Sequence, residues 1–198
     1  MSASLPAANG WTVTATAAED AITLTAVAQC TTDLGVVTAT AAGLPASLSA
    51  GDTARTSARC ADGRPLALGW SGTNTEAVAG LPLAEGATVI SWGEKDAATS
   101  ATNLLCATSA STAWPLRYDS DQVEIPAGTE GTATAACPAG NRAVGGGYVA
   151  AASVGGRVAP VTVIEAAPES EGFVVEVAAD ASGTGVLLTS YALCLPAY

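Results

Sequence analysis

The sequence predicts an all-β protein made of two pseudo-repeated, disulfide-stapled antiparallel units, each a β-sandwich or small barrel, plus an extra N-terminal hairpin. Three observations predict this class. Short runs of alternating apolar and polar residues recur along the chain, turn residues separate them, and no long stretch has the apolar spacing of a helix. A composition rich in Ala, Val, Thr, Ser and Gly, with only 5% aromatic residues, also suits thin β-structure.

A cysteine-containing turn occurs twice in the chain. Cys60–Gly63 precedes Cys137–Gly140 by 77 residues, and the second copy continues into the glycine triplet Gly145–Gly147 and Tyr148. In both copies an Ala- and Thr-rich strand is expected before the Cys, and a return strand after the turn. A repeat of this length indicates pseudo-symmetric domains rather than a solenoid.

Three further segments begin at a Gly and end at a Cys, and we expect a β-hairpin at each. They are Gly10–Cys30, Gly86–Cys106 and Gly172–Cys194, with Gly-to-Cys separations of 20, 20 and 22 residues. Strand-like alternation on both sides of an acidic or Gly-containing turn supports the hairpin in each case. The expected organisation is a half repeat over 1–30, a repeat domain over 31–110 and a second repeat domain over 111–198.

The repeat predicts two disulfides, Cys60–Cys106 and Cys137–Cys194, each joining a cysteine turn to the end of its own hairpin. Loops of this length are worth on the order of 4 kcal/mol each in the loop-entropy model. The alternative is that all the cysteines are reduced and act as small apolar residues. Cys30 has no partner unit before it; we expect it to be free and buried, and the alternative is a bond to another chain. Disulfides imply an oxidising, extracellular final environment.

Charge excludes two classes of partner. The net charge is −11, and the 7 basic residues are scattered singly among 18 acidic ones. A surface that binds the phosphate backbone of a nucleic acid needs clustered cations. We therefore expect no nucleic-acid binding and no attraction to anionic lipid. No stretch is apolar enough for membrane insertion. Met1–Pro6 lacks the basic and apolar regions of a secretory signal. A virion released by cell lysis, or an extracellular domain in its mature form, would explain how disulfides occur without such a signal.

The residue types argue against catalysis. The chain has no histidine, which removes the commonest general base and the usual Ser-His and Cys-His nucleophile systems. A pair of carboxylates is the remaining catalytic option, but the acidic residues lie in turn-like contexts where a solvated loop is the simpler explanation. Without histidine or a closely spaced Cys pair, zinc is excluded too. We predict a non-enzymatic protein without a cofactor.

Asp119, Asp121 and Glu124 are the candidate ligands for a calcium ion, because alternating carboxylates offer the oxygen atoms that Ca²⁺ prefers. The run lacks the glycine and the later bidentate acid of an EF-hand loop. The alternative is an exposed acidic connector without a bound ion.

Trp70, Trp114 and Tyr148 are the candidate ligand-contact residues. Trp70 is expected at the end of a strand and Trp114 in a connector, whereas Trp11 and Trp92 are expected in the core. A tryptophan in either position more often covers a small core than binds a ligand.

The glycine triplet Gly145–Gly147 does not predict a phosphate-binding loop, because no helix is expected after it. Two steric explanations stay open. The backbone either takes positive φ angles there, or it allows another strand or subunit to approach closely.

The run Cys137–Tyr148, with Glu171–Val175 and the closing Tyr191–Cys194, resembles a domain pattern of uncharacterised secreted actinobacterial proteins and of tail or surface proteins of their phages. The resemblance covers 125–194 and, in degraded form, 48–106, where the proline and two of the three glycines are missing. It transfers no catalytic residue. It implies an extracellular surface or a virion as the setting, with disulfide-stapled β-domains as the fold.

These features predict a non-enzymatic structural protein of a virion surface, such as a capsid decoration or a minor tail component. Its expected partners are other virion or surface proteins and further copies of itself. Residues 1–30 would either complete a neighbouring subunit by strand addition or pack on their own chain. The alternative is a secreted cell-surface module that binds a glycan or a host protein through the three aromatic residues named above. A third class, a carboxylate enzyme, would need the three acidic residues to converge across a cleft.

Overall fold

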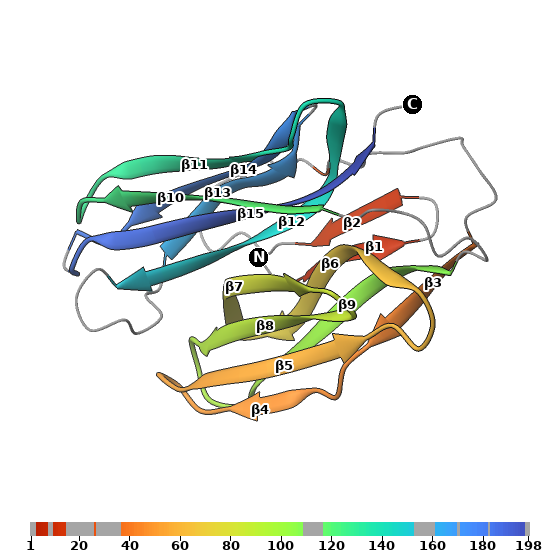
Figure 1. The fold of residues 1–198 in the computed structure, drawn as a ribbon. Coiled ribbons are helices and arrows are strands. Elements are labelled where there is room, and N and C mark those ends of the chain that lie inside the picture. Colours follow the sequence, from red (N-terminus) through yellow and green to blue (C-terminus); the bar gives the residue numbers. More distant parts are fainter. Residues whose placement is uncertain are drawn as a thin grey trace. The chain divides into compact units, whose positions relative to one another are not determined.

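A computed structural model describes residues 3–7, 10–14, 26, 37–108, 117–152, 161–169, 171–181 and 183–196. In this part of the chain every regular element is a β-strand, and the strand pairs are antiparallel (Figure 1). The predicted all-β class is confirmed. The backbone divides into two compact units, which are Met1–Ala77 with Leu83–Thr112 (unit 1) and Val78–Pro82 with Ala113–Tyr198 (unit 2).

Unit 1 contains eight whole strands in the described residues. They are β1 (Ala3–Ala7), β2 (Gly10–Thr14), β3 (Val37–Ala42), β4 (Ala46–Leu48), β5 (Thr53–Arg59), β6 (Arg64–Thr73), β8 (Gly86–Gly93) and β9 (Ala98–Thr108). One sheet has the order β2-β1-β6-β9-β3, with β4 also on β9, and β5 pairs with β8. The described start of the chain pairs with its own unit, because Ala3 and Ser4 lie opposite Ser71 and Trp70.

Unit 2 contains six whole strands in the described residues. They are β10 (Arg117–Ile125), β11 (Glu130–Ala136), β12 (Asn141–Ala152), β13 (Val161–Pro168), β14 (Gly172–Ala179) and β15 (Val186–Pro196). β15 pairs with both β10 and β12, and β14 pairs with both β11 and β13. The middle of β7 (Thr75–Leu83) also belongs to this unit, where Gly80 lies opposite Tyr148 of β12.

Alternation of side chains along the strands builds the core of unit 2. Every second residue of β14 and β15 points inward, so these two strands supply most of the apolar cluster between the sheets. Their buried members in that cluster are Phe173, Val175, Val177, Ala179, Val186, Leu188, Ala192 and Cys194. Unit 1 has two smaller clusters, one around Leu104 and one around Trp70.

The predicted hairpins at Gly86–Cys106 and Gly172–Cys194 are wrong. β8 pairs with β5, whereas the next strand, β9, joins the sheet of β6 and β3. In the same way β14 pairs with β11 and β13, whereas β15 pairs with β10 and β12. Alternation requires only that each strand bury one face, and two strands that face each other across a core satisfy this as well as two paired strands do. The second strand expected after Gly10, at 22–27, lies outside the described residues apart from Ala26.

The two units have the same succession of strand pairs. β5 pairs with β8 as β11 pairs with β14, and β6 pairs with β9 as β12 pairs with β15. The N–H of Cys60 donates to the carbonyl of Glu85, and the N–H of Cys137 donates to that of Glu171. This correspondence is what an internal repeat would produce, and the duplication itself stays a prediction.

Candidate functional site

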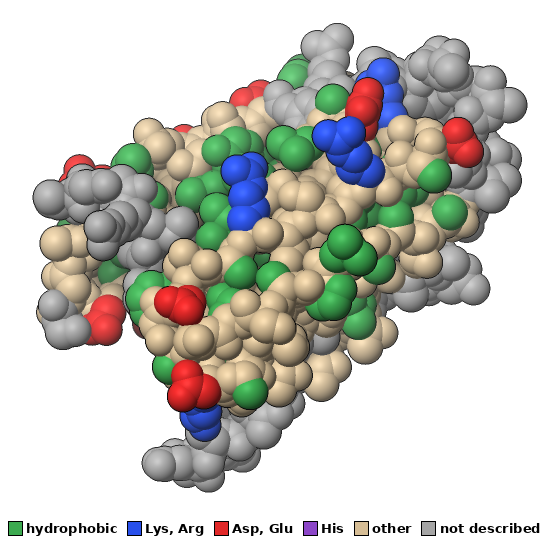
Figure 2. Space-filling model, turned by 90° about the horizontal axis from the view of Figure 1, so that it is seen from below, with side chains coloured by type: hydrophobic (Ala, Val, Ile, Leu, Met, Phe, Trp, Pro, Cys, Tyr) green, Lys and Arg blue, Asp and Glu red, His purple; other side chains and the backbone are tan. Residues whose placement is uncertain are grey.

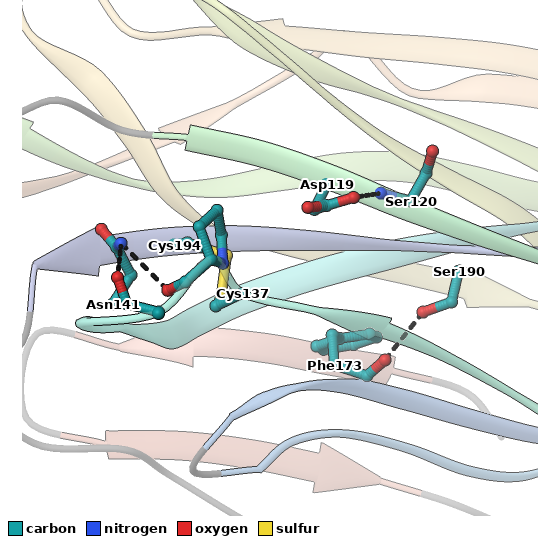
Figure 3. The surroundings of a disulfide bond; sticks show 9 residues. Asp119, Ser120, Cys137, Asn141, Phe173, Ser190 and Cys194 are labelled. Carbon is teal, nitrogen blue, oxygen red and sulfur yellow. Dashed lines mark hydrogen bonds between the residues drawn. A yellow bond between two sulfur atoms is a disulfide. The ribbon is translucent and has the colours of Figure 1, made fainter.

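The cysteine turn of unit 2 is held by hydrogen bonds within the turn itself. Gly140 has a φ of 78°, a left-handed conformation that glycine adopts without a steric penalty. The backbone N–H of Asn141 donates to the carbonyl of Pro138 at 3.0 Å, and its side-chain amide donates to the carbonyls of Pro138 and Ala139 at 3.0 and 3.3 Å (Figure 3). The turn is therefore fixed independently of any ligand.

Both predicted disulfides are confirmed, with sequence separations of 46 residues for Cys60–Cys106 and 57 for Cys137–Cys194. In unit 2 the bond joins the end of β11 to β15, and in unit 1 it joins the end of β5 to β9. Each bond therefore links two strands that belong to different sheets. Cys30 lies outside the described residues.

The glycine triplet serves close packing rather than a special backbone conformation. None of Gly145–Gly147 is among the described glycines with positive φ. A Cβ on Gly146 would collide with the ring of Phe173 and the carbonyl of Tyr191, and a Cβ on Gly147 would collide with the backbone of Gly80. Of the two explanations left open by the sequence, close approach of other chain segments is the one that applies.

Phe173 and Ser190 join the two sheets of unit 2 next to the disulfide. The Phe173 ring lies over Gly146, and its backbone carbonyl accepts a hydrogen bond of 2.8 Å from the buried hydroxyl of Ser190 (Figure 3). Because Phe173 lies on β14 and Ser190 on β15, this bond crosses the core. The motif that looked functional in the sequence is thus a structural joint.

Among the residues that the structure describes, the candidate aromatic side chains do not form a binding surface. Trp70 is only 9% exposed and packs against Leu68, Ala77 and Val89, so its ring is part of the core of unit 1. This corrects the expectation that Trp70 contacts a ligand. Tyr148 is half-buried and packs against the core of unit 2, and Trp114 lies outside the described residues.

Asp119, Asp121 and Glu124 lie on a strand, β10, and not on the connector that the sequence suggested. Side chains alternate along a strand, so the two aspartates share one face and Glu124 lies on the other. Asp119 accepts a hydrogen bond of 2.8 Å from the N–H of Ser120 (Figure 3). In the described ranges no three His, Cys, Asp or Glu side chains gather as a metal ion would require. The geometry therefore supports neither the calcium site nor a catalytic cluster of these three carboxylates.

A shallow depression in unit 1 is a candidate site that the sequence did not indicate. It has a volume of about 380 Å³, and none of its lining residues is charged. The lining residues are Thr14, Pro45, Ser71, Gly72, Thr73, Thr99, Ser100 and Ala101. They come from strands far apart in the chain, which explains why no local motif points to them.

Glu76 is a described carboxyl whose pKa is clearly displaced. Burial, and secondarily the negative charge of Glu94, raise the pKa of Glu76 to about 7. No local motif points to this group, because Glu76 and Glu94 lie 18 residues apart and on different strands or turns.

Basic side chains do not gather into a patch on the face shown in Figure 2. There the Lys and Arg side chains lie apart from one another or beside acidic side chains. None of the described residues forms a helix that is long and apolar enough to cross a membrane.

Comparison with known proteins adds no relative. No family model matches the chain, and neither a curated protein nor a solved structure is significantly similar to it. The function has to be argued from the two disulfide-stapled units themselves.

Proposed function

We propose that this protein is a non-enzymatic structural component of a virion surface, such as a capsid decoration or a minor tail protein, which assembles through β-rich interfaces. The observation that carries the proposal is the inter-sheet disulfide in each unit. Disulfides persist in oxidising, extracellular surroundings. A sandwich whose sheets are covalently joined suits a protein that must keep its shape there.

The core of unit 1 supports the same role. Its clusters contain Ala58, Ala77 and Ala87 beside few larger side chains, so apolar burial alone provides little stability. A disulfide offsets this by restricting the unfolded chain. Stability that comes from a covalent bond and a rigid sheet, rather than from a large core, is suited to a passive surface component.

The resemblance of Cys137–Tyr148 to the repeat of actinobacterial secreted proteins and phage tail or surface proteins supports the same setting. That motif now has a structural explanation, because its disulfide joins two sheets and Gly146 lets the ring of Phe173 approach from the facing sheet. A joint of this kind is compatible with many surface roles and requires no substrate.

Two measurements test the proposal. Purified protein is analysed by light scattering and native mass spectrometry at micromolar concentration, and we expect oligomers or a complex with a particle protein. Particles from the producing culture are then digested without reduction, and we expect the disulfide-linked peptide pair containing Cys137 and Cys194. A strictly monomeric protein that is missing from purified particles would refute the proposal.

The depression in unit 1 favours a second candidate, a secreted module that binds a neutral glycan. Its wall offers the hydroxyls of Thr73 and Thr99 and the ring of Pro45, and without cations it does not attract anionic ligands. Titration with neutral oligosaccharides, followed by NMR, tests this candidate. Thr73→Val should abolish binding and Thr132→Val, at an exposed position of β11 in unit 2, should not. No binding at millimolar concentration would remove the candidate.

A further inference from the structure

In unit 2, β10 and β11 are the outermost strands of their sheets. Within the described residues β10 pairs with β15, and β11 pairs with β14. The two strands follow each other in the chain, and they contact each other on one side of the sandwich. The outer edge of such a strand presents backbone N–H and C=O groups that can pair with another chain, which proteins have to prevent.

Asp121 lies on the inward face of β10. The residues two and four positions later, Val123 and Ile125, belong to the same strand face and pack in the core, where Ile125 is 1% exposed. Asp121 and Asp119 on the same face are both exposed, so the row of inward side chains continues into charged groups instead of apolar ones. An inward-pointing charge on an edge strand is a known way to discourage pairing.

The carboxylate of Asp121 also contacts the neighbouring edge. Its Oδ2 accepts a hydrogen bond of 3.4 Å from the backbone N–H of Thr134 on β11. In an antiparallel pair, alternate residues direct both backbone groups to the partner strand and the residues between them direct both groups away. The N–H of Thr134 therefore points away from β14, toward the outer edge of β11.

We propose that Asp121 prevents a second copy of the chain from adding a strand to this side of unit 2. It occupies the outward N–H of Thr134 and places a negative charge where an incoming strand would have to lie. Asp121, one of the three residues that suggested a calcium site, has this role instead. The inference goes beyond the proposed function, because it holds whether or not the protein assembles through other surfaces.

The test compares two substitutions on the same strand. Asp121→Val removes the charge and the hydrogen bond and extends the inward apolar row, whereas Glu124→Val removes an equal charge from the opposite, exposed face of β10. We expect Asp121→Val to raise the average mass by at least about twofold at a concentration where wild type and Glu124→Val are unchanged, measured by sedimentation equilibrium. Equal masses for the two variants would overturn the proposal.

Hydrogen exchange keeps the proposal testable if Asp121→Val does not fold. In the wild-type protein the Thr134 amide should exchange about fivefold more slowly than the Thr132 amide, which points to the same outer edge. Asp121→Asn, which keeps an acceptor oxygen, should preserve part of this difference, and Asp121→Ala should remove it. Equal exchange of the two amides in the wild-type protein would show that the carboxylate does not protect this edge. Neither measurement depends on particles, so its failure is distinct from failure of the proposed function.

Discussion

The hydroxyl groups of Ser91 and Ser100 lie 2.6 Å apart in a buried hydrogen bond that joins β8 to β9 inside unit 1. A second buried hydroxyl pair, Thr56 and Thr102 at 2.7 Å, joins β5 to β9. Ser91 corresponds in position to Val177 of unit 2, because each lies five residues after a glycine, Gly86 or Gly172. Ser100 corresponds to Leu188, because each lies six residues before the closing Cys of its unit. Unit 1 therefore holds its sheets together with paired hydroxyls where unit 2 uses apolar side chains.

This pairing predicts non-additive substitutions in unit 1. Ser91→Ala alone should lower the free energy of unfolding by about 1–2 kcal/mol, because it leaves the buried hydroxyl of Ser100 without its partner. Ser100→Ala should cost a similar amount. The double substitution should cost less than the sum of the two, with a coupling of about 1 kcal/mol in a double-mutant cycle followed by urea unfolding. Additive losses would show that the two hydroxyls do not depend on each other.

Removal of the disulfides should destabilise both units. The closed loops of 46 and 57 residues each correspond to about 4 kcal/mol in the loop-entropy model. We expect the Cys60→Ser/Cys106→Ser protein to lose the folded state of unit 1 at 37 °C, while the equivalent change in unit 2 lowers its melting temperature and leaves its larger apolar core folded. Calorimetry and amide exchange distinguish the units. Equal effects on both would contradict the difference inferred from their cores.

Glu76 should make stability depend on pH near neutrality. Its pKa in the folded protein is raised to about 7 from an ordinary value of 4.5, so the folded state favours the protonated form. Stability is then fully present below pH 4.5 and is lost as the pH rises through 7. Glu76→Gln should remove this loss and gain about 1–2 kcal/mol over wild type at pH 8, less than the full shift because the side chain is partly exposed.

The measurement for Glu76 is the difference in unfolding free energy between Glu76→Gln and wild type at pH 4 and pH 8, since the difference cancels the titration of other groups. Glu94→Gln is the matched control, because it removes only the secondary, Coulombic cause. It should lower the pKa of Glu76 partway. An identical pH dependence for wild type and Glu76→Gln would contradict the assignment.

Two glycines of the joint should respond differently to alanine. Gly146→Ala should cost about 2–3 kcal/mol or more, because its Cβ meets the Phe173 ring and the backbone of Tyr191 in a packed interior. Gly140→Ala has open space around the Cβ but a φ of 78°, so it should cost only about 1 kcal/mol. Urea unfolding of both variants checks the order. A larger loss for Gly140→Ala would contradict the packing role of the triplet.

Sequence reasoning could predict the fold class and both disulfides, because alternation, turns and cysteine spacing are local or repeated signals. It could not predict which sheet each strand joins. β8 and β9 look like a hairpin in the sequence because both alternate, but alternation specifies only the buried face of a strand and not its hydrogen-bonded neighbours.

Strands with little apolar character were also missed. β10 carries four charged residues and was expected as an acidic connector, and the sequence indicated no strand at β3, which is made almost entirely of Ala and Thr. The depression in unit 1 could not be predicted either, because Thr14, Ser71 and Thr99 come together only when β2, β6 and β9 do. The role proposed for Asp121 could not be inferred from the sequence either, because it depends on β10 and β11 being edge strands.

The crossing of the chain between sheets has a consequence for biosynthesis. β10 and β12 both pair with β15, so neither has that partner until about forty or more further residues have left the ribosome. The thiol of Cys137 has no partner until Cys194 has been synthesised, 57 residues later. Unit 2 is thus expected to close as a whole after synthesis, and the oxidation of its cysteines is a late event in its maturation.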